Sequence, residues 1–474
     1  MQRFGLWLDG RWHETDRWIE VRSPYDESRV GMVSAGDAHS VQQAVEAARR
    51  AMSHPLPPAQ RAEILARAAH LVEGRREDFA RTIALEAGKP LRTARIEVAR
   101  AVSTLTFAAI EARTLTGEMV PIAGAAAGVG KFAFTVREPI GVVGAITPFN
   151  FPLNLVCHKV APAIAAGCAV VLKPASATPI TALKLAEVFA EADLPRGWLN
   201  VIPGSGGEVG NALVDHPDVP LISFTGSAAV GRNIHQRAPL KKVLLELGNS
   251  SPLIVFEDAD LEAAAQAVAT HGFSHAGQSC ISVQRVLVQE TVAERFEQMV
   301  VEKVSQLVVG DPLDERTHVG PLITPAERDR VKAWIDEAVG AGARLLCGGE
   351  VQGNLLLPTV LADVTPQMKV FCQEVFGPVV GITRFRTLDE AAELANATEY
   401  GLQAGVFTAS LQTAFEMVRR LRFGGILVNE APTFRADQMP YGGVKSSGNT
   451  REGPHYAVRE MTVEKLVVLH GVNL

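Results

Sequence analysis

The stretch Gly141-Val142-Val143-Gly144-Ala145-Ile146-Thr147-Pro148-Phe149-Asn150-Phe151-Pro152 sets the pattern for the fold. Its apolar run at 142–146 predicts a buried strand, and a helical pattern begins near Pro152. More short apolar runs, alternating with helical stretches, follow along the chain. They lie at 169–172, 199–202, 221–224 and 243–245. This alternation predicts an α/β fold with a parallel doubly wound sheet, which binds ligands beyond the carboxyl ends of its strands.

The segments on either side of this block complete the expected architecture. Residues 37–115 carry apolar side chains at three- and four-residue spacing, which is typical of helices. Strand and helix patterns alternate again further along and predict a second α/β domain at about 250–430. Two extended runs around a Gly/Ala turn at 118–139 predict a hairpin. The extended stretch 460–469 is expected to pair with that hairpin or with another subunit.

Composition narrows the possible classes of function. The chain has 474 residues, of which 47% are hydrophobic and 21% charged, and this excludes a disordered or collagen-like protein. The formal net charge of −6 gives no reason to expect nucleic acid or an anionic membrane surface as a partner. The N-terminal apolar run is too short for a signal peptide, and no apolar run is long enough to predict a transmembrane helix.

Cys280 is the cysteine with the features of a nucleophile. The chain has five cysteines without C-x-x-C spacing, which favours reduced thiols in the cytoplasm over a disulfide framework or a metal site. Most lone cysteines are buried and inert, and we interpret the other four in this way. Cys280 instead lies among small polar residues in Gly277-Gln278-Ser279-Cys280, where a thiol has the access that nucleophilic catalysis requires.

Two polar residues at predicted strand ends are candidates to assist this thiol. Glu246 follows the run at 243–245 and is either a surface carboxylate or a general base in the ligand crevice. In the crevice, partial desolvation would raise its pKa. Asn150 follows the first predicted strand and is either an N-cap or turn asparagine or the donor of a hydrogen bond to a developing oxyanion.

Three further segments are candidates to contact a nucleotide. Lys173 follows the second predicted strand, where it is either a solvated surface lysine or within reach of a ribose or phosphate. Segments 204–207 and 224–231 are glycine-bearing turns of the kind that let a pyrophosphate approach the backbone. Neither turn has the G-x-G-x-x-G pattern, so neither identifies a dinucleotide site by itself.

Seven segments together resemble the aldehyde dehydrogenase superfamily, in the family's order and over nearly the whole chain. They are TPFNFP at 147–152, KP at 173–174, FTGS at 224–227 with Gly231, ELG at 246–248, GQSC at 277–280, EVFGP at 374–378 and PYGGVK at 440–445. The interval between Glu246 and Cys280 is also similar to the family's interval. The segment FRADQMPY at 434–441 is similar to the lactaldehyde dehydrogenase-like branch.

The resemblance implies roles for these residues. Cys280 would be the nucleophile, Asn150 and the Cys280 backbone N–H the oxyanion hole, and Glu246 the general base. Lys173 belongs to the same catalytic set and, with Glu374, would hold the riboses of NAD or NADP. The complete set implied at the cofactor site is Ile146, Thr147, Pro148, Phe149, Lys173, Ala175, Ser176, Gly206, Gly210, Phe224, Thr225, Gly226, Ser227, Gly231, Leu247, Glu374 and Phe376.

The family's fold also implies a division of the chain and a homodimer or homotetramer. The implied parts are a cofactor-binding domain at 1–117 and 140–248, a catalytic domain at 249–430, an oligomerisation hairpin and tail at 118–139 and 455–474, and a substrate-pocket loop at 431–454.

The implied reaction needs no metal. The thiolate of Cys280 would attack the aldehyde, hydride would pass to the nicotinamide, and a water activated by Glu246 would hydrolyse the thioester. The chain departs from the family at Phe149, Asn249 and Gln373, which replace a tryptophan, a glycine and an acidic residue. No proposed chemical group is lost, although Asn249 stands where it could alter the movement of the Glu246 side chain.

Ser176 bears on the choice of cofactor. Family members restricted to NAD often carry glutamate at this position, and that carboxylate would repel the 2′-phosphate of NADP. Serine removes the repulsion, and Lys173 could attract the phosphate. We therefore expect NADP to be accepted.

The residues at the family's substrate pocket are mostly polar in this chain. They are Arg100, Asn154, His158, Ser279, Ile281, Ser282, Phe434, Arg435 and Asp437. This lining indicates a small hydroxylated or anionic aldehyde, such as lactaldehyde, a semialdehyde, or a phosphono- or sulfo-aldehyde. For Arg435, the alternative to an anion anchor is a structural salt bridge.

Three other functions remain as alternatives. A CoA-acylating dehydrogenase is disfavoured because such relatives generally lack the glutamate that Glu246 matches. An inactive structural or binding homologue would have had no reason to keep Cys280, Asn150 and Glu246 together with Lys173 and Glu374. A plain cysteine hydrolase leaves Lys173 and the glycine turns unexplained.

Overall fold

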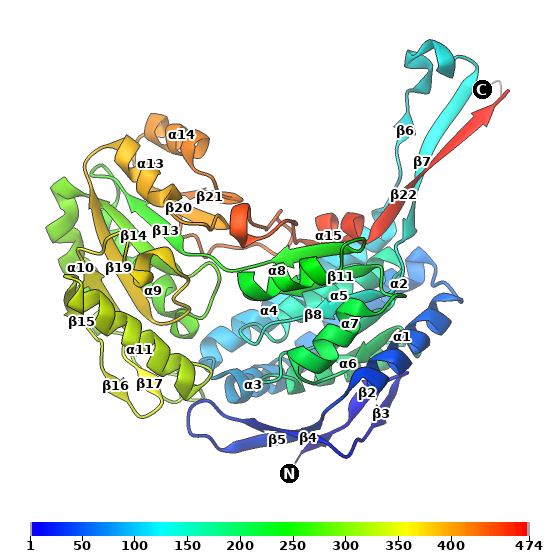
Figure 1. Cartoon of the computed structure of the whole chain (residues 1–474), viewed down its shortest axis with the longest axis horizontal. Coiled ribbons are helices and arrows are strands. Elements are labelled where there is room, and N and C mark those ends of the chain that lie inside the picture. Colours follow the sequence, from blue (N-terminus) through cyan, green and yellow to red (C-terminus); the bar gives the residue numbers. More distant parts are fainter. Residues whose placement is uncertain (1, 472–474) are drawn as a thin grey trace.

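Two α/β halves and a projecting arm make up the computed structural model, which describes residues 2–471 (Figure 1). One half contains a seven-stranded sheet built from residues 6–246, and the other contains a seven-stranded sheet built from residues 251–428. The predicted α/β class, with two mainly parallel sheets, is confirmed.

The first sheet has five consecutive parallel strands, which confirm the five apolar runs of the sequence as strands. In spatial order its members are β12 (Lys242–Glu246), β11 (Leu221–Thr225), β8 (Val143–Ile146), β9 (Val170–Lys173), β10 (Leu199–Val201), β2 (Leu6–Leu8) and β3 (Arg11–His13). The sequence pattern does not predict the antiparallel edge strands β2 and β3, because three residues are too few to show a period.

The order of strands reverses beside β8. The chain leaves β8 for β9 and β10 on one side of it and returns to β11 and β12 on the other. In doubly wound sheets, the crevice beyond the carboxyl ends at such a reversal is the usual ligand site. Thr147, which follows β8, and Thr225, which ends β11, lie at this crevice.

Helices cover both faces of the first sheet, and the expected helices at 37–115 are confirmed. The helices of this half are α1 (Ala38–Met52), α2 (Pro58–Gly74), α3 (Arg76–Ala87), α4 (Leu91–Thr114), α5 (Asn154–Ala166), α6 (Ile180–Glu191), the π-helical turn η3 (Gly206–Gly210), α7 (Asn211–Asp215) and α8 (Ala228–Arg237). Alternate residues of β9 enter two cores: Val170 and Leu172 pack towards α2–α6, and Val171 packs towards α1, α7 and α8. A separate three-stranded sheet pairs β1 (Arg3–Phe4), β5 (Arg29–Ser34) and β4 (Trp18–Arg22).

The second sheet is parallel except at one edge, where β15 runs antiparallel to β18. In spatial order its strands are β15 (Arg344–Cys347), β18 (Thr359–Ala362), β19 (Val379–Phe385), β14 (Val283–Gln289), β13 (Ser251–Val255), β20 (Gln403–Phe407) and β21 (Gly425–Val428). The other elements of this half are α9 (Leu261–Phe273), η4 (Ser274–Gly277), η5 (Glu290–Val292), α10 (Ala293–Ser305), α11 (Pro325–Gly340), the pair β16 (Val351–Gln352) and β17 (Leu355–Leu356), α12 (Lys369–Cys372), α13 (Leu388–Asn396), α14 (Leu411–Arg420) and η6 (Lys445–Ser447).

The arm confirms that the extended tail pairs with the predicted hairpin. Its central strand β7 (Lys131–Pro139) runs antiparallel to both β6 (Met119–Val120) and β22 (Thr462–His470). Two short 3-10 turns, η1 (Ile122–Gly124) and η2 (Ala126–Gly128), connect β6 to β7. Figure 1 shows this arm projecting from the first half of the molecule.

The expected start of the tail at residue 455 needs a correction. Residues 455–460 belong to the helix α15 (Pro454–Glu460), which packs against α4 and α5 rather than joining the arm. Pro454 suits the first turn of a helix because its missing N–H would have no helical partner there. Residues 472–474 of the expected tail lie outside the described residues.

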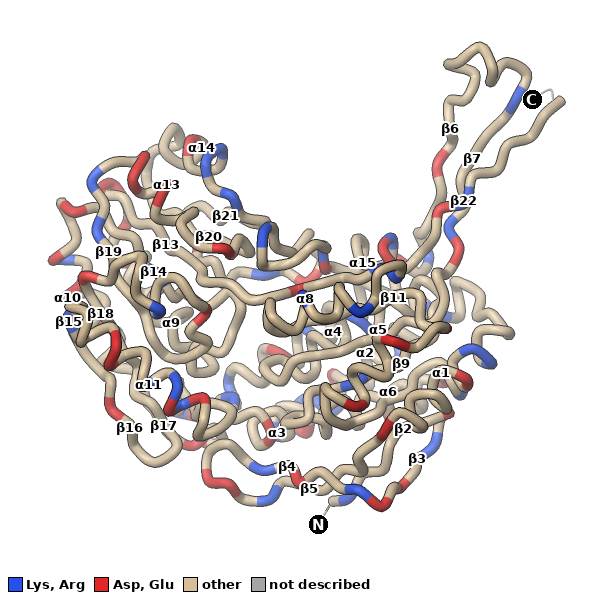
Figure 2. Tube along the Cα trace, in the orientation of Figure 1, with Lys and Arg blue, Asp and Glu red and all other residues tan. Residues whose placement is uncertain are grey.

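Basic and acidic side chains are interspersed along the outer elements of both halves (Figure 2). Within residues 2–471, no helix is long and apolar enough to cross a membrane. The same residues contain no group of three or more His, Cys, Asp or Glu side chains placed to hold a metal ion.

Candidate active site

Three loops meet where the two halves face each other. Cys280 lies between η4 and β14, Asn150 follows β8, and Glu246 ends β12. Asn150 Nδ2 donates a hydrogen bond to the Gln278 carbonyl oxygen at 2.9 Å, which joins the first two loops. The adjacent residues Tyr441 and Gly442 link the Cys280 loop to Glu246. Tyr441 Oη lies 2.9 Å from Cys280 Sγ, and a Cβ placed on Gly442 would lie 2.9 Å from Glu246 Oε1.

A strained turn presents Cys280. His275, Ala276 and Gly277 have φ values of 50°, 53° and 70°, in the left-handed region. Glycine is required at 277, because a Cβ there would lie 2.1 Å from the Gly377 carbonyl oxygen. The buried Gln278 side chain holds the turn, since it donates to the carbonyl oxygens of His275 and Pro321 and accepts from a backbone N–H. The loop is therefore fixed before any substrate arrives.

The two predicted oxyanion donors each have an N–H group that is available. One N–H of the buried Asn150 amide is used by Gln278, so the other remains available. The Cys280 backbone N–H makes no hydrogen bond among the described residues. The alternative that Asn150 caps a helix is wrong, because the first N–H groups of α5 donate instead to the Glu97 carboxylate.

The Cys280 thiol is partly buried. Burial raises the pKa of this thiol to about 12, and its hydrogen bond with Tyr441 opposes the rise. The thiol is therefore largely protonated in this state, and a base must remove its proton before attack.

Glu246 has the environment expected of that base. Its side chain is buried, and neither carboxyl oxygen has a hydrogen-bond partner among the described residues. Burial, together with the negative charge of Glu452, raises the pKa of Glu246 well above its usual value. The alternative of a solvated surface carboxylate is wrong, since Glu246 is only 3% exposed.

A buried charge cluster lies behind Glu246. The Glu452 carboxylate accepts hydrogen bonds from Lys159 at 3.1 Å and from Arg435 at 2.9 Å, and all three side chains are buried. These two cations lower the pKa of Glu452 to about 2, whereas Glu246 faces the cluster without a hydrogen bond. The sequence reasoning did not single out Lys159 or Glu452, and no local motif marks them.

The predicted cofactor residues lie along the carboxyl ends of β8, β9, β11 and β12. The hydroxyls of Thr147 and Thr225 are buried without a hydrogen-bond partner among the described residues. Lys173 is only 5% exposed, so it is not a solvated surface lysine. Burial lowers the pKa of its ammonium to about 8, and Nζ donates to the Pro174 carbonyl at 2.7 Å. A Cβ at Gly206 would meet no atom within 4 Å. Unpaired donors and open backbone fit the ribose hydroxyls and pyrophosphate of a dinucleotide.

The second half of the molecule contributes Glu374 and Phe376 to this crevice. The Glu374 carboxylate accepts a hydrogen bond from the Asn249 backbone N–H at 2.9 Å, and burial raises its pKa to about 7. A Cβ at Gly248 would lie 2.4 Å from Glu374 Oε2, so a larger residue there would displace the Glu374 carboxylate. The rings of Phe376 and Phe149 meet edge to face, with 5.8 Å between their centroids.

The remaining predicted cofactor residues lie on the same strand ends and turns. Ser176 is exposed, and its hydroxyl donates to the Gly204 carbonyl at 2.9 Å. Ser227 caps α8, and Gly231 packs closely against the Leu247 side chain, which would have to shift to admit a Cβ at 231. The others are Ile146, Pro148, Ala175, Gly210, Phe224 and Gly226.

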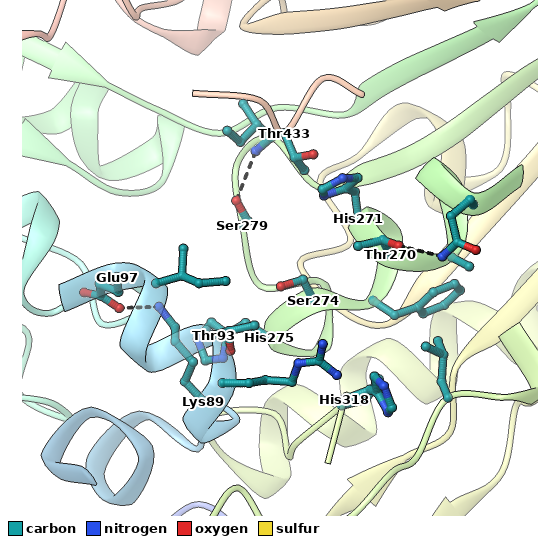
Figure 3. A pocket seen from close by; sticks show the side chains of 18 of the residues that line it. Lys89, Thr93, Glu97, Thr270, His271, Ser274, His275, Ser279, His318 and Thr433 are labelled. Carbon is teal, nitrogen blue, oxygen red and sulfur yellow. Dashed lines mark hydrogen bonds and ion pairs between the residues drawn. The ribbon is translucent and has the colours of Figure 1, made fainter. Parts of the chain in front are cut away.

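A cavity of about 500 Å³ opens beside the nucleophile, between α4 and the second half (Figure 3). Ser279 and Ile281, which flank Cys280, line it together with Arg100. His275 and Thr433 also line it. Both ring nitrogens of His275 and the Thr433 hydroxyl lack a hydrogen-bond partner among the described residues.

Four of the expected substrate residues form one cluster, in which three of them contact the Asp437 carboxylate. Asp437 accepts hydrogen bonds from Arg100 at 2.9 Å and from Asn154 at 3.0 Å, and its Oδ1 lies 3.1 Å from His158 Nε2. Burial lowers the pKa of His158 to about 4, so its imidazole is neutral. Arg100 is the member of this group that lines the cavity, while Asn154 and His158 are buried behind it.

The structure does not bring three other expected substrate residues to the cavity wall. The Ser282 hydroxyl donates to the carbonyl oxygens of His271 and Gly272. Phe434 is 51% exposed. Arg435 forms the buried salt bridge with Glu452 that the sequence left open as an alternative.

Comparison with known proteins identifies the family. The sequence profile of the aldehyde dehydrogenase family matches residues 12–467. The chain belongs to the aldehyde dehydrogenase family. It is an oxidoreductase that acts on aldehydes, and the predicted resemblance is confirmed.

Similar proteins support this assignment over the full chain. A 3-sulfolactaldehyde dehydrogenase of Priestia megaterium is 47% identical over 99% of this chain and 98% of its own length. A lactaldehyde dehydrogenase of Methanococcus maripaludis is 40% identical over 98% of this chain and 100% of its own.

Solved structures show the same fold. An NAD-dependent aldehyde dehydrogenase of Sinorhizobium meliloti is 37% identical, with a TM-score of 0.96 over 100% of this chain and 96% of its own. The glyceraldehyde-3-phosphate dehydrogenase GapN of Methanocaldococcus jannaschii, complexed with NADP, is 39% identical, with a TM-score of 0.92 over 96% of this chain and 100% of its own.

Proposed function

We propose that this protein oxidises a small hydroxylated or anionic aldehyde to its carboxylic acid, with NAD or NADP as the oxidant. The observation that carries this proposal is the meeting of the loops of Cys280, Asn150 and Glu246, next to a cavity whose mainly apolar wall carries the guanidinium groups of Arg92 and Arg100. The family membership and the names of the relatives point to the same reaction.

The residues act in two stages. Glu246 takes the proton from Cys280, and the thiolate forms a C–S bond to the aldehyde carbon. The second Asn150 N–H and the Cys280 N–H stabilise the resulting oxyanion. The nicotinamide, when bound, supplies the acceptor for the hydride. Glu246 releases the thiol proton to solvent and, ionised again, removes a proton from water. The hydroxide attacks the thioester, and the C–S electron pair returns to Cys280 as the acid leaves.

Charged and hydrogen-bonding groups on the cavity wall support an anionic or hydroxylated substrate. Arg92 and Arg100 lie two turns apart on one face of α4, and both line the cavity. Arg100 is paired with Asp437, whereas Arg92 makes no hydrogen bond or ion pair among the described residues. The unpartnered nitrogens of His275 and hydroxyl of Thr433 add hydrogen-bonding groups for a substrate hydroxyl. We therefore place lactaldehyde and 3-sulfolactaldehyde, the substrates in the relatives' names, first among the candidates.

NADP acceptance rests on Ser176 and Lys173. Ser176 offers a hydroxyl where a carboxylate would repel the 2′-phosphate, and the Lys173 ammonium has no carboxylate partner among the described residues. Both features leave room for an additional negative charge.

The arm is the expected site of oligomerisation. Val463, Leu466 and Val468 of β22 are 49%, 56% and 42% exposed, which is unusual for apolar side chains in one strand. We propose that the arm joins subunits in a homodimer or homotetramer, which size-exclusion chromatography with light scattering would test.

The five free cysteines are compatible with a reducing compartment, and we propose that the protein works in the cytoplasm.

An aldehyde panel followed at the nicotinamide absorbance band tests the proposed reaction. The panel pairs each aldehyde with NAD and with NADP, and it is run with and without CoA. We expect the highest kcat/KM with a three-carbon hydroxylated or sulfonated aldehyde, measurable activity with NADP, and a free acid as product in both conditions. Higher kcat/KM for long-chain aliphatic aldehydes, or a CoA thioester as product, would contradict the proposal.

A further inference from the structure

The hydroxyl of Tyr441 is the hydrogen-bond partner of the nucleophile. Tyr441 Oη lies 2.9 Å from Cys280 Sγ, and the sulfur makes no other hydrogen bond among the described residues. The Tyr441 side chain is 2% exposed and packs with Ile281 and Leu402. This apolar cluster fixes the ring, so the hydroxyl has a defined position against the sulfur.

Chemistry decides which atom donates when the thiol is ionised. Burial raises the pKa of Tyr441 well above that of a free phenol, so the hydroxyl keeps its proton. A thiolate can only accept, and a hydrogen bond to a charged acceptor is stronger than one to a neutral acceptor. The contact therefore stabilises the thiolate more than the thiol.

Arg435 strengthens this donor from behind. Its guanidinium carbon lies 3.7 Å from the centroid of the Tyr441 ring, and its salt bridge with Glu452 holds it there. A cation over an aromatic face is attracted to the ring's electrons. Drawing electron density away from the phenol oxygen makes its hydrogen a better donor.

We propose that Tyr441 is a further catalytic residue, whose hydroxyl donates to the Cys280 thiolate during attack and again when the thiolate leaves the thioester. Arg435 acts through Tyr441 as a positioning residue. The proposal rests on the proposed function only in taking Cys280 as the nucleophile. No proton leaves Tyr441 in either stage, because Glu246 accepts the proton of the thiol, releases it to solvent, and then accepts the proton of the attacking water.

The size of the effect follows from two opposing terms. Losing a hydrogen bond to a charged group shifts the thiol pKa upward by about one to two units, so the thiolate fraction falls roughly 10- to 100-fold. The more basic thiolate is intrinsically more reactive, by roughly three- to eightfold for a Brønsted slope near 0.45. The net result is an alkylation rate about three- to tenfold slower at neutral pH.

The test is the alkylation of full-length Tyr441→Phe by iodoacetamide from pH 6 to 10, with Cys280 occupancy measured by mass spectrometry. Cys280→Ser gives the background, and Tyr456→Phe, which removes a phenol away from the cavity, is the matched control. We expect the pH profile to move to higher pH only in Tyr441→Phe. A profile identical to that of the parent enzyme would overturn the proposal.

Arg435→Lys provides a second, independent measurement. This variant keeps a positive charge beside Glu452 but loses the planar group over the ring. We expect it to slow alkylation when Tyr441 is present and to have no further effect in the Tyr441→Phe background. An equal slowing in both backgrounds would contradict action through the hydroxyl.

These readouts separate the two proposals, because no aldehyde is involved in alkylation. If alkylation at Cys280 left the dehydrogenase activity intact, the proposed function would fail. If alkylation abolished activity but was unaffected by Tyr441→Phe, only the role of Tyr441 would fail.

Discussion

Replacing Asn150 by alanine should remove one of two oxyanion donors and leave the nucleophile in place. The Asn150 amide has two N–H groups, one of which Gln278 occupies at 2.9 Å. In the proposed mechanism, the other N–H and the backbone N–H of Cys280 are the two donors to the developing negative charge. Loss of one such donor typically costs about 3–4 kcal/mol of transition-state stabilisation, which is a factor of about 10²–10³ in kcat.

The same substitution also has a structural cost. The Gln278 carbonyl oxygen would lose a buried partner, which is expected to destabilise the fold by about 1–3 kcal/mol. Asn200→Ala is a matched control, because the buried Asn200 side chain also bonds to backbone groups, at Gly197 and Asp9. That control should lose stability without losing a comparable factor in kcat.

The assay combines steady-state kinetics with iodoacetamide alkylation. Alkylation forms no oxyanion, so Asn150→Ala should alkylate at Cys280 within about threefold of the parent rate while its kcat falls by at least 10². The reasoning would be refuted if kcat stayed within fivefold of the parent value. It would also be refuted if alkylation fell as much as kcat, because Asn150 would then act on the thiol rather than on the oxyanion.

Three further substitutions test other parts of the site. Arg92→Gln should lower kcat/KM for sulfolactaldehyde by several-fold at low salt, because an unpaired cation at the cavity wall attracts anions. The kcat/KM for the neutral lactaldehyde should stay the same. Equal losses for both aldehydes would count against this role. Glu452→Gln should lower the unfolding free energy by about 3–5 kcal/mol, measured by urea denaturation, because it leaves Lys159 and Arg435 buried without their carboxylate. Glu452→Gln should also move the acidic limb of the kcat–pH profile to lower pH. Glu246 loses a neighbouring negative charge, so its raised pKa falls and this base stays ionised at lower pH. An acidic limb that did not move would contradict this coupling. Ser176→Glu should lower kcat/KM for NADP by at least tenfold relative to kcat/KM for NAD. An unchanged ratio of the two kcat/KM values would show that residue 176 does not interact with the 2′-phosphate.

Local patterns predict a large part of this fold. The apolar runs that form β8, β9, β10, β11 and β12 are each short and bounded by turns. Their length and the flanking turn residues therefore both indicate strands. The boundary at residue 455 could not be predicted in the same way. The helix α15 is seven residues long and is stabilised by packing on α4 and α5, which a local pattern does not record.

The candidate site was predictable where a residue has a local motif. Cys280, Glu246 and Asn150 each lie in a short segment of characteristic composition at a predicted strand or helix end. The contact between Tyr441 and Cys280 joins residues 161 positions apart, and the convergence on Asp437 spans still longer intervals. Such contacts depend on how the two sheets face each other. For the same reason, the sequence alone could not decide whether Arg435 binds substrate or Glu452.

The most direct test of the account is the covalent state of Glu246→Gln after one turnover. The variant would be mixed with excess lactaldehyde and NADP, and the nicotinamide absorbance and the intact protein mass would be followed together. In this variant the thiol must lose its proton to solvent, so reduced cofactor should form slowly. Its formation should stop at about one equivalent, with the acyl group attached to Cys280, because the base for hydrolysis is missing. Unimpeded turnover by the variant, or reduced cofactor formed without any adduct on Cys280, would contradict the account.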